Sequence, residues 1–321
     1  AGPDDAAQRG CPRLSPAGQF GEPRRPGGRA LDVVSFGSVF LEVVFGGFDR
    51  LPGPGEELFV EPFAFSLGGA VTSATAARQA GAAVGLASVL GDDLGSRLLT
   101  EHCARVGVDL SLSETVSGPT AGITVVLNFD GDRAFITHMP SLSPGAPKCE
   151  HWARVLEQEQ PAWCYLHAGP QVVGLLRRAR ELGTRVAVDV NLEEVAEFPA
   201  VVVECARLAG VFVPNETELV RLTGSPGLEE AISVAASWCP LVVVKRGAKG
   251  AVAVEKGVAT EVSEGLLDVV VKDRTGAGDA FAGATIASLA KGAGLVEAVG
   301  AGNAAGSEAV ARLGAAGPLP V

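Results

Sequence analysis

Short apolar runs alternate with longer stretches of helical periodicity through most of this chain. Near-continuous apolar runs predict buried strands, and apolar residues at every third or fourth position predict helices. In the second half, strands are predicted at 162–167, 185–190, 211–213 and 241–245, and a hairpin at 251–255 and 258–262. The predicted helices of this half are 172–182, 201–208, 216–222, 227–237, 277–291 and 295–312. This alternation indicates a parallel sheet covered by helices on both faces.

The first half repeats the pattern with two interruptions. Strands are predicted at 31–37 and 84–90, and helices from Gly68-Gly69 through Ala80 and over 95–106. The segments 38–66 and 119–140 carry short alternating strands instead, the second one with a hairpin around Asp130-Gly131. With right-handed crossovers, the rest of the chain is expected to form a doubly wound, three-layer α/β/α sandwich.

Residues 1–30 carry almost no periodic apolar positions and are rich in Gly, Pro, Arg and Asp. We therefore expect a disordered tail there and one domain over 31–321. The chain begins without Met, so residue 1 is not assumed to be the native start.

Charge and cysteine content narrow the class of protein. The net charge is −11 and no basic run with interleaved aromatic residues occurs, so we expect no nucleic-acid partner. The six cysteines form no Cys-x-x-Cys pair and the four histidines lack metal-ligand spacing, which favours reduced thiols and ordinary histidines. No stretch is long and apolar enough to span a membrane, so no membrane partner is expected. The expected location is cytoplasmic.

Residues 272–281, Lys-Asp-Arg-Thr-Gly-Ala-Gly-Asp-Ala-Phe, are the strongest chemical signal. They follow the apolar run Leu266 to Val271, which predicts a strand, and they open the predicted helix 277–291. The unpaired N–H groups of a helix start bind anions, and glycines let an anion approach the backbone. Asp279 in such a place suits a base that takes a proton from a hydroxyl. An acidic residue that only stabilises the helix dipole is the alternative.

The pattern Asp-x-Thr-Gly-Ala-Gly-Asp-Ala-Phe at 273–281 resembles the signature of the ribokinase-like (PfkB) family of sugar and nucleoside kinases. Weaker resemblance extends from about 31 to 315. It implies that the segments 38–66 and 119–140 form a small β-sheet lid over the substrate. It also implies ATP and Mg²⁺ as cofactors, and a monovalent cation such as K⁺ near the carbonyls of Asp273 and Thr275.

The resemblance assigns the candidate site residues. Asp279 is the expected catalytic base, and Gly276, Ala277 and Gly278 form the anion-binding loop. Asn215 and Glu218 are the expected Mg²⁺ residues, although Asn followed three positions later by Glu also fits a capping box. The expected nucleotide-binding residues are Asn191, Lys245, Gly247, Gly250, Thr275 and Asn303. The expected substrate-binding residues are Glu42, Gly68, Gly69, Ser73 and Asp279.

We therefore predict an ATP-dependent kinase that phosphorylates a hydroxyl of a small sugar or sugar-like substrate. A nucleoside kinase of the adenosine type is an alternative. A ligand-sensing member with weak catalysis is another, because Phe40, Glu42, Ser73 and Glu193 depart from the family pattern. A dinucleotide-binding enzyme or a P-loop enzyme would need glycine motifs that this chain lacks. Exposed lid strands could pair two copies, so a homodimer through the lid is also open.

Overall fold

The computed structural model describes residues 31–129, 133–140 and 147–320. The expected tail, 1–30, and the hairpin tip at Asp130-Gly131 lie outside the described residues. Within them, no helix combines the length and the apolar character that a membrane crossing requires.

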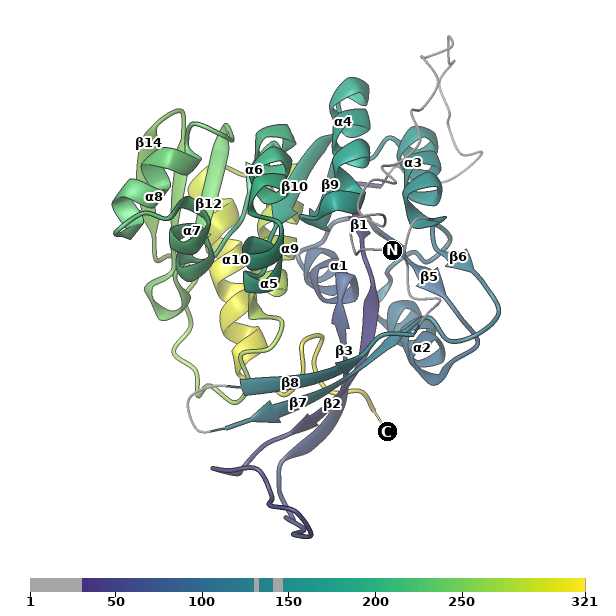
Figure 1. Ribbon diagram of the computed structural model, residues 1–321. Helices are drawn as coiled ribbons and strands as arrows, with labels where there is room; N and C mark the ends of the chain where they lie inside the picture. Colours follow the sequence, from purple (N-terminus) through teal and green to yellow (C-terminus); the bar gives the residue numbers. More distant parts are fainter. Residues whose placement is uncertain (1–30, 130–132, 141–146, 321) are drawn as a thin grey trace, which may run out of the picture.

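An eight-stranded sheet forms the centre of the molecule (Figure 1), with the strand order β14-β13-β12-β11-β10-β9-β1-β4. Strands β1, β4 and β9 to β12 are parallel, and β13 and β14 extend the sheet as an antiparallel hairpin. The bounds are β1 Val33–Phe36, β4 Val84–Ala87, β9 Trp163–His167, β10 Arg185–Asp189, β11 Val211–Phe212, β12 Leu241–Lys245, β13 Ala251–Glu255 and β14 Val258–Val262. The predicted strands and hairpin of the second half are therefore present.

Helices cover both faces of this sheet. One face is covered by α3 Pro147–Glu159, α4 Val173–Leu182, α6 Pro199–Leu208, α7 Glu216–Thr223 and α8 Leu228–Ala235. The other is covered by α1 Ala70–Gln79, α2 Leu94–Val106, α9 Ala277–Ala290 and α10 Leu295–Val310. Along β9, Cys164 and Leu166 pack in the first core, and Trp163 and Tyr165 pack in the second. Because strand residues alternate between faces, the near-continuous apolar run fills two cores, as the predicted three-layer sandwich requires.

A second sheet, which we call the lid, projects from the body (Figure 1). It contains four strands in the order β3-β2-β7-β8. Their bounds are β2 Val39–Phe45, β3 Phe63–Gly69, β7 Gly122–Asn128 and β8 Arg133–His138. The two segments that broke the βα rhythm thus supply the lid strands. A pair formed by β5 Val89–Leu90 and β6 Glu114–Thr115 lies beside α2.

The prediction of a strand over Leu266 to Val271 is wrong. This segment forms no strand, and Leu267, Val270 and Val271 are exposed to 45%, 80% and 53%. A β-branched run favours a strand only where a partner strand accepts its hydrogen bonds, and here the sheet already ends at β14. The helices α3 and α5 (Leu192–Glu197) were not predicted, and the single strand expected at 84–90 divides into β4 and β5.

Candidate functional site

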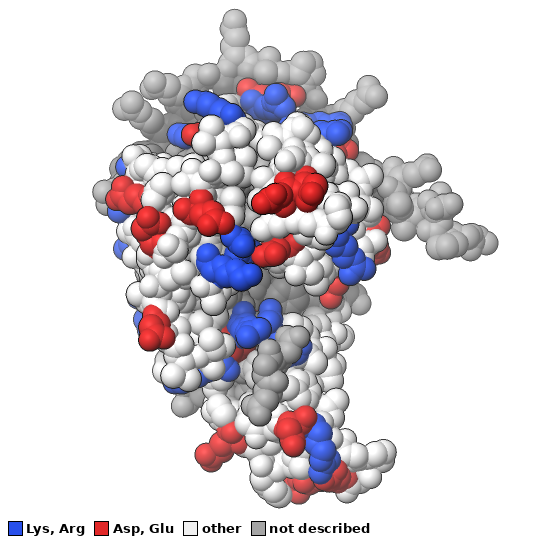
Figure 2. All heavy atoms as spheres, turned by 90° about the vertical axis from the view of Figure 1, so that its left-hand side faces the viewer, with Lys and Arg blue, Asp and Glu red and all other residues white. Residues whose placement is uncertain are grey.

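A cavity of about 840 Å³ lies at the carboxyl ends of the parallel strands, where ligands bind in open α/β sheets. Its walls are the ends of β9, β10 and β12, the start of α9, the exposed segment 266–271 and Arg133 from the lid. Figure 2 shows a hollow on the face that carries β14 and α8, with Lys or Arg side chains on either side of it. The cavity is wide enough for a nucleotide and a small second molecule.

Four polar side chains project from the ends of the parallel strands on the α9 side of the sheet. Tyr165 and His167 lie two and four residues after Trp163 on β9, so their side chains are on the same face of the sheet as Trp163, which packs in the core with α9. Asp189 pairs in register with His167 across β9 and β10. Lys245 is the last residue of β12, and its side chain is on the same face of the sheet as that of Val243, which belongs to the same core. Strand alternation therefore brings these side chains together beneath the first turn of α9.

Asp279 lies in the first turn of α9 with its side chain 21% exposed. Its Oδ1 accepts a hydrogen bond of 2.7 Å from the Tyr165 hydroxyl and faces Nε2 of His167 at 3.1 Å. Burial alone would raise the pKa of Asp279, but the hydrogen bond and charge of His167, together with Tyr165 and Lys245, lower that pKa. The carboxylate is therefore ionised at neutral pH and held by one oxygen.

His167 is a part of the site that the sequence analysis missed. Its Nδ1 lies 3.8 Å from Oε2 of Glu194, so both ring nitrogens face carboxylates. Burial would lower the pKa of His167, but Asp279 and Glu194 raise that pKa well above its ordinary value. The position of His167 at the end of the predicted strand 162–167 was the available signal, because carboxyl ends of parallel strands meet at one edge.

Lys245 and Asp189 form a buried ion pair beside Asp279. The Lys245 ammonium lies 2.8 Å from Oδ1 and 2.7 Å from Oδ2 of Asp189, whose side chain is 2% exposed. A Cβ at Gly278 would lie 3.1 Å from Nζ of Lys245. The ammonium is therefore next to the first turn of α9. The ligand atoms of His167, Asp189 and Asp279 lie within 4.8 Å of one another, but the contacts of Asp189 with Lys245 fit an ion-pair network better than a metal site.

Asn215 and Glu218 form a capping box at the start of α7 and also line the cavity. The Asn215 amide oxygen accepts from the Glu218 N–H, and Glu218 Oε2 accepts from the Asn215 N–H. Burial raises the pKa of the Glu218 carboxyl to about 7, and the charge of Lys245 lowers that pKa in part. A divalent cation would compensate this buried carboxylate, so the residues present fit Mg²⁺.

The expected nucleotide-binding residues lie mostly around the cavity. Asn191, Lys245, Gly247, Gly250 and Asn303 line it. The Asn191 side chain forms a capping box with Glu194, and the amide of Asn303 donates to Val262 O and Glu264 O. Thr275 lies outside the lining: it is buried and its hydroxyl donates to Asp273 Oδ1.

The expected substrate-binding residues other than Asp279 belong to the lid strands β2 and β3 or to α1, and they are absent from the described lining of this cavity. Glu42 is 5% exposed, and its Oε2 accepts from the Ala315 N–H. Gly68 packs against Glu42, since a Cβ there would lie 2.2 Å from Oε1. Gly69, with a φ of 77°, precedes α1, and the Ser73 hydroxyl contacts Ser35 and Ala70 inside the body.

Comparisons with known proteins agree with this fold. The model of the pfkB family of carbohydrate kinases matches residues 31–321. Aminoimidazole riboside kinase from Salmonella typhimurium is 30% identical over 264 residues, which cover 75% of this chain and 80% of that protein. Adenosine kinase from Sinorhizobium meliloti superposes with a TM-score of 0.77 at 20% identity, over 91% of this chain and 97% of that one. The structure of Arabidopsis thaliana ribokinase complexed with ribose and ATP superposes with a TM-score of 0.71 at 23% identity, over 89% of this chain and 95% of that one.

Proposed function

Because the chain belongs to the pfkB family of carbohydrate kinases, whose members phosphorylate a hydroxyl of a sugar or nucleoside, we propose that Asp279 is the catalytic base of an ATP-dependent sugar kinase. The observation that carries this role is the placement of Asp279. Its carboxylate lies in the anion-binding turn of α9, lines the cavity, and is held through Oδ1 by Tyr165 and His167. Oδ2 then accepts the proton of the substrate hydroxyl.

The proposed reaction is a single displacement at phosphorus. The acceptor oxygen loses its proton to Asp279 Oδ2 and forms a bond to the γ-phosphorus, while the bond from that phosphorus to the β,γ-bridging oxygen breaks and ADP leaves. The backbone N–H groups of Ala277, Gly278 and Asp279 face the charge on the transferring group, with Gly276 allowing the turn at a φ of 72°. Lys245 adds a positive charge next to Gly278.

The nucleotide is assigned to the side of the cavity nearer α10. Leu266, Leu267 and Val269 provide an apolar wall for a base ring, which explains why this run is exposed. Gly247 and Gly250 permit close approach of the chain. Asn215 and Glu218 would hold Mg²⁺, which supplies charge neutralisation for the phosphates when bound. Carbonyls near Asp273 and Thr275 remain the proposed position of a monovalent cation.

The Asp279→Asn variant tests the assignment. The amide keeps the shape and the hydrogen-bonding capacity of the side chain but cannot take up the proton. We expect kcat to fall by about 10²–10⁴-fold, with ATP-analogue affinity and thermal stability close to those of the unchanged protein. Asp92→Asn, at an exposed position, is the matched control. An Asp279→Asn enzyme that keeps most of its turnover would refute the role of Asp279.

A nucleoside acceptor is the second candidate. The similarity to aminoimidazole riboside kinase at 30% identity supports it, because that protein's name describes a base attached to a ribose. The discriminating experiment is ATP consumption with matched pairs of free sugars and ribosides. Turnover of ribose or fructose with no turnover of ribosides would favour the sugar kinase, and the converse would favour the nucleoside kinase.

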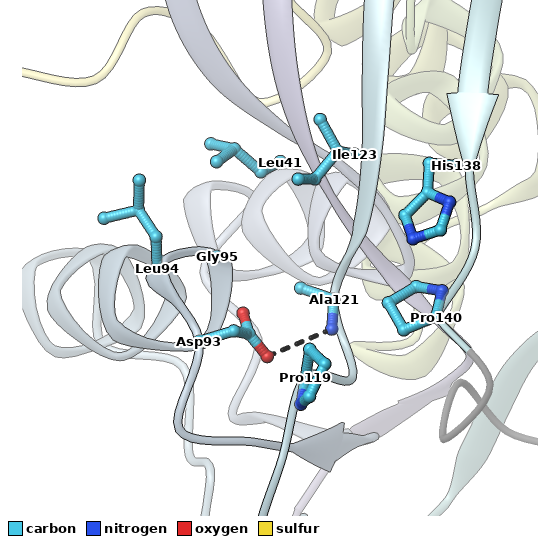
Figure 3. A pocket seen from close by; sticks show the side chains of 9 residues that line it. All are labelled: Leu41, Asp93, Leu94, Gly95, Pro119, Ala121, Ile123, His138 and Pro140. Atoms are coloured by element: carbon cyan, nitrogen blue, oxygen red, sulfur yellow. Dashed lines mark hydrogen bonds between the residues drawn. The ribbon is translucent and has the colours of Figure 1, made fainter.

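A homodimer through the lid is the proposed assembly. Strand pairing places Val43, Phe65, Val125 and Ile136 on one face of the lid, opposite to the face that carries Glu42. Ile136 is 64% exposed. At the root of the lid, this apolar face continues into a cavity of about 180 Å³, shown with Leu41, Ile123 and Leu94 around it (Figure 3). A second copy would cover this surface.

A further inference from the structure

The hydroxyl of Tyr165 lies between two carboxylates but has one hydrogen to donate. It is 2.7 Å from Oδ1 of Asp279 and 3.0 Å from Oδ2 of Asp189. Tyr165 itself is 1% exposed, so water does not compete for this hydrogen. The hydroxyl can therefore donate a full hydrogen bond to only one of the two carboxylates at a time. It donates to the carboxylate that has fewer other donors.

The Asp189 carboxylate has several hydrogen-bond donors around it. Both of its oxygens contact the Lys245 ammonium, and Oδ1 also accepts from the Val190 N–H at 2.8 Å. The Lys245 ammonium, however, lies next to Gly278 in the anion-binding turn of α9. A phosphate group bound at that turn attracts the ammonium, because the two charges are opposite and the Lys245 side chain is only 13% exposed.

We propose that Lys245, Asp189 and Tyr165 form a relay by which nucleotide binding frees the catalytic carboxylate of Asp279. A phosphate that draws the Lys245 ammonium away from Asp189 leaves this buried carboxylate short of a partner, which is costly. The Tyr165 hydroxyl then turns from Asp279 to Asp189. Asp279 loses a donor on Oδ1 and becomes more basic when the phosphoryl donor is in place. This proposal depends on the proposed function, and Tyr165 and Asp189 act in it as positioning residues.

The remaining groups around Asp279 do not replace this relay. His167 stays on Oδ1 of Asp279 and faces Glu194 on its other side. Glu42 of the lid also adds negative charge in the neighbourhood of Asp279. The consequence of the relay is an order of events: with Tyr165 on Asp279 the carboxylate is a weaker base, and it becomes a stronger one only when a nucleotide is bound.

Tyr165 is the single tyrosine of the chain, so its hydroxyl can be observed directly. Protein grown with tyrosine labelled with ¹³C at Cζ gives one tyrosine resonance, whose shift reports the hydrogen bonding of the hydroxyl. The probe is the β,γ-imido analogue of ATP with Mg²⁺ at pH 8, without an acceptor, and calorimetry verifies saturation. We expect the resonance to move on saturation.

Two variants test the route. In Lys245→Met, the free protein should already show the resonance at the nucleotide-bound position, and the analogue should move it no further. In Asp189→Asn, the analogue should bind without moving it. Lys291→Gln removes an ammonium at the Ala80 carbonyl, away from the cavity, and should behave as the unchanged protein. A resonance that stays still at saturation, or moves equally in Lys245→Met, would overturn the relay. No binding of the analogue by the unchanged protein would overturn the proposed function as well.

Steady-state kinetics give an independent readout. In Tyr165→Phe no hydroxyl can replace Lys245 on Asp189, so the Lys245 ammonium stays with Asp189 and does not contact the phosphate. The KM for ATP should therefore rise by about 10-fold, as expected for one lost charge contact. The acid limb of the pH profile of kcat should match that of the unchanged protein. In the nucleotide complex of the unchanged protein the Tyr165 hydroxyl has already left Asp279, so its removal does not change the pKa of Asp279. A fixed hydrogen bond from Tyr165 to Asp279 predicts the opposite: an acid limb at higher pH with an unchanged KM for ATP.

Discussion

Nε2 of His167 lies 3.1 Å from Oδ1 of Asp279, from the end of β9 to the first turn of α9. The two residues are 112 positions apart in the chain, and they meet because β9 ends where α9 begins. With Asp279 and Glu194 raising the pKa of His167, the ring is a cation at neutral pH. Its charge is one of the causes that lower the pKa of Asp279, so the histidine sets how basic the proposed catalytic carboxylate is.

Replacing His167 by Gln should move the acid limb of kcat/KM to higher pH. The glutamine amide can still donate to Asp279, but it carries no charge, so the pKa of Asp279 rises toward its ordinary range. Activity is lost as the pH falls through the pKa of Asp279, and a higher pKa brings this loss closer to neutrality. The measurement is kcat/KM between pH 4 and 9, with His151→Gln as the control, since His151 contacts Leu112 O outside the cavity. Superimposable acid limbs for the two variants would contradict this role of His167.

Glu42 should make the protein less stable as the pH rises. Burial, with the charges of Asp273 and Asp279, raises the pKa of Glu42 from 4.5 to about 7. Between these values the unfolded state binds fewer protons than the folded state, so the free energy of unfolding falls by about 3 kcal/mol and then stays constant. Glu42→Gln should remove this decrease. Urea unfolding at pH 5 and pH 8 measures it, with Glu57→Gln at an exposed lid position as the control. An unchanged pH dependence in Glu42→Gln would show that Glu42 is not the cause.

The layers of the fold could be predicted from the sequence, but the hydrogen-bond partners of Asp279 could not. The sequence of 163–167 predicts that side chains alternate between the two faces of the sheet. It does not predict which of the two faces packs against α9. Tyr165 and His167 therefore could not be assigned to Asp279 in advance. The run Leu266 to Val271 failed for the opposite reason. Its local preference for a strand is real, but it lines the cavity instead of pairing with β14.

Other expectations could not be separated by sequence alone. Asn215 and Glu218 do form the capping box that was the alternative to a metal role. A capping box uses the N–H groups at a helix start, and the same carboxylate can still face a cavity. The Asn-x-x-Glu spacing predicts the capping box. It does not predict whether the carboxylate faces a cavity, because that depends on what packs around the helix.

The loop between β12 and β13 offers a matched pair of glycine substitutions. Gly250 has φ and ψ of 78° and −128°, which only glycine adopts readily, and a Cβ there would lie 2.2 Å from Val262 O. Gly247 has a φ of 57° and open space around it. We expect Gly250→Ala to lower the free energy of unfolding by about 3 kcal/mol and Gly247→Ala by about 1 kcal/mol. Chemical denaturation measures both. Equal losses would mean that the β14 backbone gives way to a side chain at position 250.

Replacing Ile136 by Glu should convert a lid-paired dimer into a monomer. The side chain is 64% exposed and lies on the apolar face of the lid, where a second copy would bury it. A buried, unpaired carboxylate at that interface costs several kcal/mol, enough to raise the dissociation constant by orders of magnitude. Light scattering after size exclusion over a range of concentrations measures the change. Val258→Glu is the matched control, because Val258 is a 66% exposed strand residue on β14 of the body. If the unchanged protein is monomeric, or if both variants dissociate alike, the lid is not the interface.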